Sequence, residues 1–239
     1  MVEQFDTRQM MLDLFREPTE RDKQVSIGAS NASNPCTRCL ADDLLGIPQQ
    51  QSGAFMGAVI GTAIHNLLEK RVEKMHSEWM PEQRVSIGYL EGYGEVKSTT
   101  DLYIPSEQLA HDHKSTTKVK LVQIKEALTT EATEYDTSKV AEARFKTQWY
   151  LAQLHLYGLG IERAGHVVQW LSLGFVCRDA VGASDVWAHV VPYDREHADR
   201  VWGRLERLWS ALQGGLDPTG LTSHPNCWYC QNVRDREDR

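Results

Sequence analysis

Two pairs of cysteines, each with two residues between its members, lie near opposite ends of the chain. Cys36 and Cys39 form the first pair and Cys227 and Cys230 the second, in a sequence of 239 residues. Two such pairs supply the four thiolates that a tetrahedral Zn²⁺ ion or a [4Fe-4S] cluster requires. Where thiols are kept reduced, metal binding explains this spacing better than disulfides do. The pattern therefore predicts a fold whose two ends meet at one structural metal site.

The composition narrows the location and the class of protein. No apolar run reaches the roughly 18 residues that a membrane span needs, and the first residues lack a basic segment followed by an apolar stretch. We therefore expect a cytoplasmic protein. The formal net charge of -7 argues against a protein that coats nucleic acid nonspecifically, because phosphate binding draws on Lys and Arg. It is compatible with an enzyme whose acidic residues hold metal ions.

Hydrophobic periodicity divides the chain into helices and strands. Helical spacing predicts an amphipathic helix over residues 6–15 and longer helices over 54–75, 144–162 and 194–213, the last with Asp194 as its N-cap and Gly214 and Gly215 as its stop. Segments rich in glycine, proline and β-branched residues predict a meander of strands over 84–114 and two more strands over 166–176 and 184–193. The polar stretch 116–143 is expected to hold one or two strands edged by a loop. Cys177, in the first of the two later strands, is expected to be a small core residue.

Two aspartates stand on neighbouring expected strands. Asp101 lies in STTDLYI and Asp112 in AHDHKST, so a turn at Pro105 would bring both carboxylates near one end of the strand pair. Carboxylates suit Mg²⁺ and Mn²⁺, and either ion can activate water for phosphodiester hydrolysis. Lys114 follows Asp112 by two residues, so both side chains lie on one face of a strand, where the lysine could orient water or neutralise phosphate. His113 would point away and offer only its backbone carbonyl to the metal.

An acidic residue followed two positions later by lysine is a weak signal by itself. Glu95 and Lys97 form a rival pair, and a solvated strand edge is the simpler explanation of either pair taken alone. Asp112 and Lys114 are preferred because a second acid, Asp101, precedes them on its own expected strand.

Two helices carry further polar residues that this chemistry would use. His65 lies in mid-helix, four residues after Gly61. As a ligand it would favour Mn²⁺ over Mg²⁺, because imidazole suits the softer ion; an ordinary core or surface histidine is the alternative. Gln153 and Tyr157 are four residues apart, which places them on one helix face. An ordinary amphipathic helix is the alternative there.

Taken in order, Gly-x-x-x-His, an aspartate on a strand, Asp-x-Lys and a helical Gln-x-x-x-Tyr resemble the RecB-like branch of the PD-(D/E)XK nucleases. The resemblance spans Gly61 to Tyr157. It implies an α/β fold with a restriction-endonuclease-like core, a mixed central sheet flanked by helices. It also implies a set of site residues: the metal ligands His65, Asp101 and Asp112, the catalytic lysine Lys114, and Gln153 and Tyr157, which would orient the site or touch DNA.

The cysteines resemble a feature of the same branch. Many RecB-like exonucleases, including the CRISPR-associated exonuclease, join their two ends through a [4Fe-4S] cluster. Those relatives usually have one cysteine upstream and three downstream, whereas this chain has two and two. The resemblance favours [4Fe-4S], and structural Zn²⁺ stays open because thiolates suit both. It predicts an N-terminal segment over 1–53, a nuclease core over 54–213 and a C-terminal cysteine knuckle over 214–239, with a metal-cluster lobe joining the two ends.

Basic residues follow the acid and lysine pair. A group that could track a DNA backbone comprises Lys118, Lys120, Lys125, Lys139, Arg144 and Lys146; a solvated surface is the alternative. Trp228 and Tyr229 could stack on bases or pack the cysteine cluster. The resemblance implies a Mg²⁺- or Mn²⁺-dependent exonuclease that cuts DNA from free or single-stranded ends in recombination, repair or phage DNA metabolism, with a recombination or repair protein as a partner. The alternative is a nuclease-fold subunit that binds DNA or a partner without cutting.

Overall fold

The protein is built around a five-stranded mixed sheet. The computed structural model describes residues 26–47 and 55–234, so the helix expected over residues 6–15 lies outside the described residues. The sheet order follows the chain: β1 (Met80–Leu90), β2 (Gly94–Ile104), β3 (Leu109–Thr116), β4 (Trp170–Cys177) and β5 (Val186–Pro192). Neighbouring strands are antiparallel except β3 and β4, which are parallel. The expected α/β fold, a mixed sheet flanked by helices, is confirmed.

The first three strands form the expected meander. A turn with Gly92 and Gly94 at positive φ joins β1 to β2, a conformation that glycine adopts without strain. A short 3-10 turn, Pro105–Glu107, joins β2 to β3. The pairing of β1 slips at a bulge beside Gly88, and Trp202 packs there so closely that any side chain would collide with its ring. The absence of a side chain at Gly88 therefore lets the helix that carries Trp202 pack directly on the hairpin formed by β1 and β2.

The parallel pair β3 and β4 requires a crossover connection. Two helices supply it, α5 (Lys118–Thr129) and α6 (Ser138–Arg163). The expectation of strands within 116–143 is therefore wrong. Thr117 caps α5 by accepting a hydrogen bond from the Lys120 backbone N–H, and Leu121 and Ile124, three residues apart, turn into the core. A cap followed by apolar residues at helical spacing outweighs the threonine-rich surroundings.

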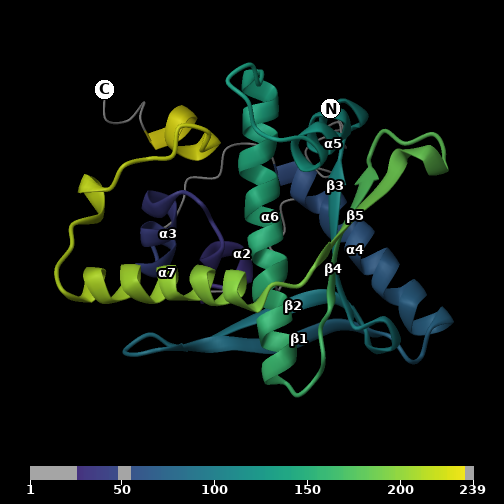
Figure 1. Cartoon of the computed structure of the whole chain (residues 1–239), viewed down its shortest axis with the longest axis horizontal. Coiled ribbons are helices and arrows are strands. Elements are labelled where there is room, and N and C mark those ends of the chain that lie inside the picture. The colour runs from purple at the N-terminus through teal and green to yellow at the C-terminus, as the bar shows by residue number, and fades with distance from the viewer. Residues whose placement is uncertain (1–25, 48–54, 235–239) are drawn as a thin grey trace, which may run out of the picture.

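Helices α4 and α6 cover opposite faces of the sheet. α4 (Phe55–Met75), the expected helix with His65 in its middle, lies against β3 where Gly61 meets Ser115. α6 packs on the other face, where Gln153 contacts Lys114 of the same strand. Figure 1 shows α6 as the long central helix, with β3 and β4 between it and α4. Alternate residues of β3 therefore face the two helices in turn.

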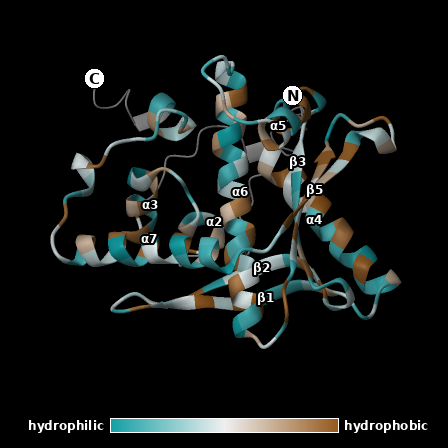
Figure 2. Cartoon of the chain, viewed as in Figure 1, coloured by the Kyte–Doolittle hydropathy of each residue, from teal (hydrophilic) through white to brown (hydrophobic). Residues whose placement is uncertain are grey.

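Helix α7 (Arg195–Gln213) begins and ends where the sequence indicates. Asp194 accepts a hydrogen bond from the His197 backbone N–H, and Gly214 stands at the C-terminal end. Figure 2 shows hydrophobic and hydrophilic residues alternating along the helix. Its buried residues are Ala198, Trp202, Leu205, Leu208 and Leu212. Cys177, at the end of β4, is buried as expected.

Short helices lie at both ends of the described chain. α2 (Ala29–Ala32) and α3 (Thr37–Leu44) place their apolar residues in the main core, and a π-helical turn, Cys230–Arg234, ends the described residues. The division into 1–53, 54–213 and 214–239 stays a prediction. Within residues 26–47 and 55–234, every helix is too short or too polar to span a bilayer.

Candidate active site and cysteine cluster

The candidate active site opens where β2 and β3 part. Their ladder ends at the pair of Leu102 and His111, so Asp101 and Asp112 stand at the point of divergence. The Asp101 carboxylate accepts a 2.7 Å hydrogen bond from the backbone N–H of His113, which lies beyond the last pair of the ladder and needs another acceptor. The separation of the strands thus places both expected aspartates at one opening.

Asp112 and Lys114 form a buried ion pair on the α6 side of β3. Lys114 Nζ lies 3.0 Å from Asp112 Oδ1, 2.8 Å from Oδ2 and 3.2 Å from Gln153 Oε1. Burial raises the pKa of Asp112 to about 6, although Lys114 acts in the opposite direction. Burial would lower the pKa of Lys114, but Asp112 and Asp101 outweigh it and raise that pKa. The lysine is therefore charged at neutral pH.

The rival pair has the same spacing in a different environment. Lys97 Nζ and Glu95 Oε2 are 2.8 Å apart, and these side chains are 46% and 44% exposed. The corresponding exposures are 21% for Lys114 and 2% for Asp112. Exposed ion pairs are common and contribute little, whereas buried, perturbed charges gather at functional sites. The structure thus separates two pairs that the sequence pattern alone leaves equal.

A third carboxylate, Glu82, joins the site and was not expected from the sequence. The strand pairs on either side of it are in register, so Glu82 of β1 stands opposite Asp101 of β2. His65, Glu82 and Asp101 each offer a ligand atom within 4.8 Å of the others, and His65 Nδ1 is 3.3 Å from Asp101 Oδ2. The one available signal was long-range, because only continuing the antiparallel register back from the turn at Gly92 places Glu82 beside Asp101.

These acidic groups fit a divalent cation. Like charges directly opposite on neighbouring strands destabilise a sheet, and Glu82 and Asp101 are such a pair. Among the described residues, Asp112 Oδ2 has no polar partner besides the Lys114 ammonium 2.8 Å away, which leaves a lone pair for a cation. Carboxylate oxygens of this kind suit Mg²⁺ or Mn²⁺, and the imidazole of His65 suits Mn²⁺.

Histidines line the α4 side of the opening. His113 Nδ1 lies 2.8 Å from His111 Nε2, and His111 Nδ1 lies 2.8 Å from Ser172 Oγ. Burial lowers the pKa of His111 to about 3 and also lowers that of His113, so both rings are neutral. The His113 ring lies on the face opposite Lys114, with its centroid 5.8 Å from that of His65. A metal contact through the His113 carbonyl stays a prediction.

Gln153 and Tyr157 lie behind the lysine. Gln153 Nε2 donates to the Tyr157 hydroxyl while Gln153 Oε1 accepts from Lys114. Both side chains are buried, and burial raises the pKa of Tyr157 well above its usual range. This pair therefore orients Lys114 from inside the protein and presents little surface to DNA.

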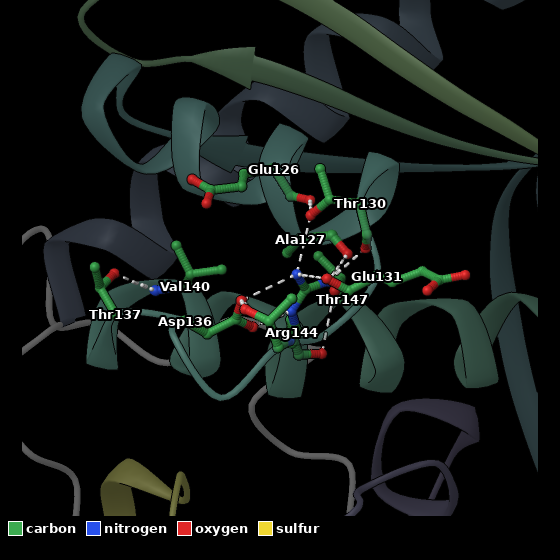
Figure 3. A network of polar contacts seen from close by, with 10 residues as sticks. Glu126, Ala127, Thr130, Glu131, Asp136, Thr137, Val140, Arg144 and Thr147 are labelled. Atoms are coloured by element: carbon green, nitrogen blue, oxygen red, sulfur yellow. Dashed lines mark hydrogen bonds and ion pairs between the residues drawn. The ribbon is translucent and has the colours of Figure 1, made fainter.

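Arg144 is bound by the loop between α5 and α6. Its guanidinium donates to the Asp136 carboxylate, to the Thr130 hydroxyl and to the backbone carbonyls of Ala127, Thr130 and Glu131 (Figure 3). These contacts occupy its N–H groups. Arg144 therefore joins α5 to α6, and a DNA contact by this residue stays a prediction.

Three other members of the basic group are lysines near the protein surface. Lys118 pairs with Asp185 at 2.9 Å and Lys146 with Glu142 at 2.7 Å, while Lys120 is exposed. Ion pairs at a partly exposed surface break at low cost. DNA contacts by these three lysines stay a prediction.

The four paired cysteines meet in a buried cluster, as expected. The Sγ–Sγ distances are 3.7 Å for Cys36 and Cys230, 3.6 Å for Cys39 and Cys227, and 3.5 Å for Cys39 and Cys230. All four Sγ atoms lie within 4.8 Å of one another, and none forms a disulfide. The N-terminal and C-terminal regions are therefore joined at a group of donors that could hold a metal.

Aromatic side chains surround this cluster. Phe145 and Trp149 pack on it from α6, and Tyr229 packs on it from the C-terminal segment. Trp228 is exposed. The two aromatic residues beside the last cysteines thus differ, since one belongs to the packing and the other faces solvent.

The fold has relatives among solved structures. The sequence matches no known family model and no curated protein. A candidate exonuclease from Eubacterium rectale has a TM-score of 0.52 at 11% identity, over 97% of this chain and 94% of that one. The chain shares its fold with that protein.

Two further neighbours carry exonuclease names. One is the alkaline exonuclease from Laribacter hongkongensis in complex with dAMP, with a TM-score of 0.49 at 12% identity over 80% of this chain and 89% of that one. The other is a phage-related exonuclease from Haemophilus somnus, with a TM-score of 0.46 at 12% identity over 89% and 91%.

Proposed function

We propose that this chain is a metal-dependent deoxyribonuclease of the PD-(D/E)XK type. The observation that carries the proposal is the buried pair of Asp112 and Lys114 at the same opening as Asp101 and Glu82. Holding such charges away from water costs free energy, and proteins concentrate perturbed charges at functional sites. The exonuclease description of the neighbour that shares the fold supports the same class.

The carboxylates would hold the cation, and the lysine would act on the substrate. The proposed ligands are His65, Glu82, Asp101, Asp112 and the His113 carbonyl. A bound Mg²⁺ or Mn²⁺ lowers the pKa of water and neutralises charge that develops on the phosphate. Lys114, fixed by Asp112 and Gln153, holds an ammonium group in place to orient water or a phosphate oxygen.

We further propose that the substrate is DNA with free ends, single-stranded in preference, in recombination, repair or phage DNA metabolism. Lys118 and Lys120 begin α5 directly after the strand that carries Lys114. They supply cations beside the site for a nucleic acid backbone.

The test uses end-labelled DNA in linear single-stranded, linear double-stranded and circular single-stranded forms, with Mg²⁺, Mn²⁺ or EDTA. We expect metal-dependent loss of linear single strands and survival of circles. Asp112→Asn and Lys114→Met should each lower the rate roughly 10²-fold or more. Glu95→Gln and Lys97→Met are the matched controls, since they change the same spacing on an exposed surface, and they should keep the rate.

Each result bears on a different part of the proposal. Equal rates in all variants would contradict the assignment of Asp112 and Lys114. Cleavage of circles would contradict an exonuclease. DNA binding by wild-type protein without cleavage under any metal would favour the non-cutting subunit instead.

A further inference from the structure

The cysteine cluster is narrower than an iron-sulfur cluster requires. In a tetrahedral site with metal–sulfur bonds of about 2.3 Å, the four sulfurs stand about 3.8 Å apart. In a [4Fe-4S] cube each thiolate binds a different iron and points outward from its own corner, which spreads the sulfurs to roughly 6 Å. Three Sγ–Sγ distances here lie between 3.5 and 3.7 Å, and all six lie within 4.8 Å. The donors therefore outline the coordination shell of one ion.

Hydrogen bonds to the first cysteine loop support this spacing. The His224 backbone N–H donates to Cys36 Sγ at 3.4 Å. Arg204 of α7 donates to the carbonyls of Asn34 and Pro35, at 2.7 and 3.2 Å. Such contacts orient ligands and offset the negative charge of a four-thiolate site. They hold the segment before Cys36 in position.

Aromatic side chains pack on the other side of the cysteine cluster, toward α6. The His224 ring lies on Phe145 of α6, with centroids 4.5 Å apart, and Phe145 is itself buried against the cysteines. Spreading the sulfurs to fit a [4Fe-4S] cube would move α3 away from the C-terminal segment. It would disturb both the hydrogen bond to Cys36 and the packing of His224 on Phe145. The packing thus favours the narrow arrangement.

We propose that Cys36, Cys39, Cys227 and Cys230 hold a single tetrahedral zinc ion in place of an iron-sulfur cluster. Zn²⁺ accepts four thiolates in a closed site with no open position, so its role is structural. The division of the ligands into two C-x-x-C pairs, one from each end of the chain, agrees with this kind of site. The site is separate from the acidic opening, so the proposal does not depend on nuclease activity.

The metal content of the full chain tests the proposal. Protein is purified without air and dialysed against a weak chelator, which strips loosely held ions from the acidic site. We expect one zinc per chain, no acid-labile sulfide and no broad visible absorption. X-ray absorption at the zinc edge should show four sulfurs at about 2.3 Å. Replacement by Co²⁺ should give the intense ligand-field bands of tetrahedral thiolate coordination.

A matched pair of variants assigns the ion to the cluster. Cys227→Ser should lose the zinc, while Cys177→Ser, which changes the buried cysteine of β4, should retain it. If Cys227→Ser does not fold, the wild-type analysis alone decides. Iron with acid-labile sulfide in equal amounts, a single iron, or metal-free protein with cysteine disulfides would each overturn the proposal.

Discussion

Glu82 and Asp101 are like charges placed opposite each other on neighbouring strands. Without a cation, such a pair costs a few tenths to about 1 kcal/mol, and the His65 imidazole 3.3 Å from Asp101 Oδ2 offsets part of that cost. Glu82 also has a φ of 47°, a left-handed conformation that adds backbone strain for a residue with a side chain. A cation between the carboxylates removes the repulsion. Glu82 should therefore lower the free energy of unfolding when no metal is bound and raise it when a metal ion is bound.

Glu82→Gln is expected to shift stability in opposite directions in two buffers. In EDTA the variant should be more stable than wild type by roughly 0.5 kcal/mol, because one of two like charges is gone. In Mn²⁺ it should be less stable than wild type, because it binds the ion at least ~10-fold more weakly. Urea denaturation in both buffers and calorimetric titration measure these effects.

Glu107→Gln is the control, because Glu107 is an exposed acid in the turn before β3. It should behave as wild type in both buffers. A Glu82→Gln effect of the same sign with and without metal would argue against Glu82 as a ligand.

Residues marked by a local pattern could be found from the sequence, and residues placed by distant contacts could not. Asp112 and Lys114 stand two apart on one strand, and Asp101 stands on the next, so the turn between them was enough to bring them together. Glu82 depends on the register of the whole β1–β2 hairpin. The contacts of Arg144 could not be predicted either, because the sequence shows its charge and not the acceptors that fill its N–H groups.

At the scale of elements, Arg144 determines how α5 and α6 are joined. Its contacts reach the last turn of α5, the loop and Asp136 near the start of α6. The backbone carbonyls at the end of a helix lack intrahelical partners, and a planar guanidinium can satisfy several at once. The prediction of strands in this region was wrong because the threonine-rich composition was given more weight than the cap at Thr117 and the apolar spacing of Leu121 and Ile124.

Arg144→Lys is expected to destabilise the protein by on the order of 1 kcal/mol, because an ammonium keeps the charge but loses the fork of donors. Urea denaturation measures the effect. Lys146→Met, which removes a partly exposed pair with Glu142, should change stability by only roughly 0.5 kcal/mol. If Arg144 instead bound DNA, Arg144→Lys would weaken DNA binding and leave the denaturation midpoint unchanged.

His155 couples α6 to the start of α7. The Asp194 backbone N–H donates to His155 Nδ1 at 3.3 Å, so this nitrogen is an acceptor and the ring is neutral. Burial lowers the pKa of His155 to about 4, and the nearby His197 acts in the same direction while Asp194 opposes it. An unfolded histidine titrates near 6.5. The unfolded chain therefore binds more protons between these two values, and stability falls as the pH drops through them.

For His155 this loss amounts to about 2 kcal/mol between pH 8 and pH 5. His155→Gln should remove that part of the pH dependence, as measured by urea denaturation at the two pH values. His166→Gln, at an exposed histidine after α6, should leave the dependence as in wild type. A pH dependence that is the same in His155→Gln and in wild type would rule out this coupling.

At the scale of the whole molecule, the two ends of the described chain are joined at the cysteines. Cys36 and Cys230 are 194 residues apart in sequence, and a cross-link that closes so long a loop stabilises the fold by on the order of 5 kcal/mol through the unfolded state. The paired spacing was enough to predict this junction. The spacing of the sulfurs was not predictable, because it depends on how α3, α6 and the C-terminal segment pack.

Removing the cluster metal with a strong chelator should lower the free energy of unfolding by several kcal/mol. Cys39→Ser should show the same loss and no further response to the chelator, as measured by urea denaturation. Stability unaffected by the chelator in wild type, with metal removal verified, would mean that packing alone joins the two ends.

Helix α6 touches both sites. Phe145 and Trp149 pack on the cysteine cluster, and Gln153, four residues further, holds Lys114. When binding at one site orders an element that also carries the other site, the two binding equilibria are linked, and the linkage is reciprocal. If an ion held by the cysteines orders α6 at Gln153, it raises the affinity of the acidic opening for its own ion. An ion bound at the acidic opening would, by the same factor, raise the affinity of the four cysteines for their metal ion.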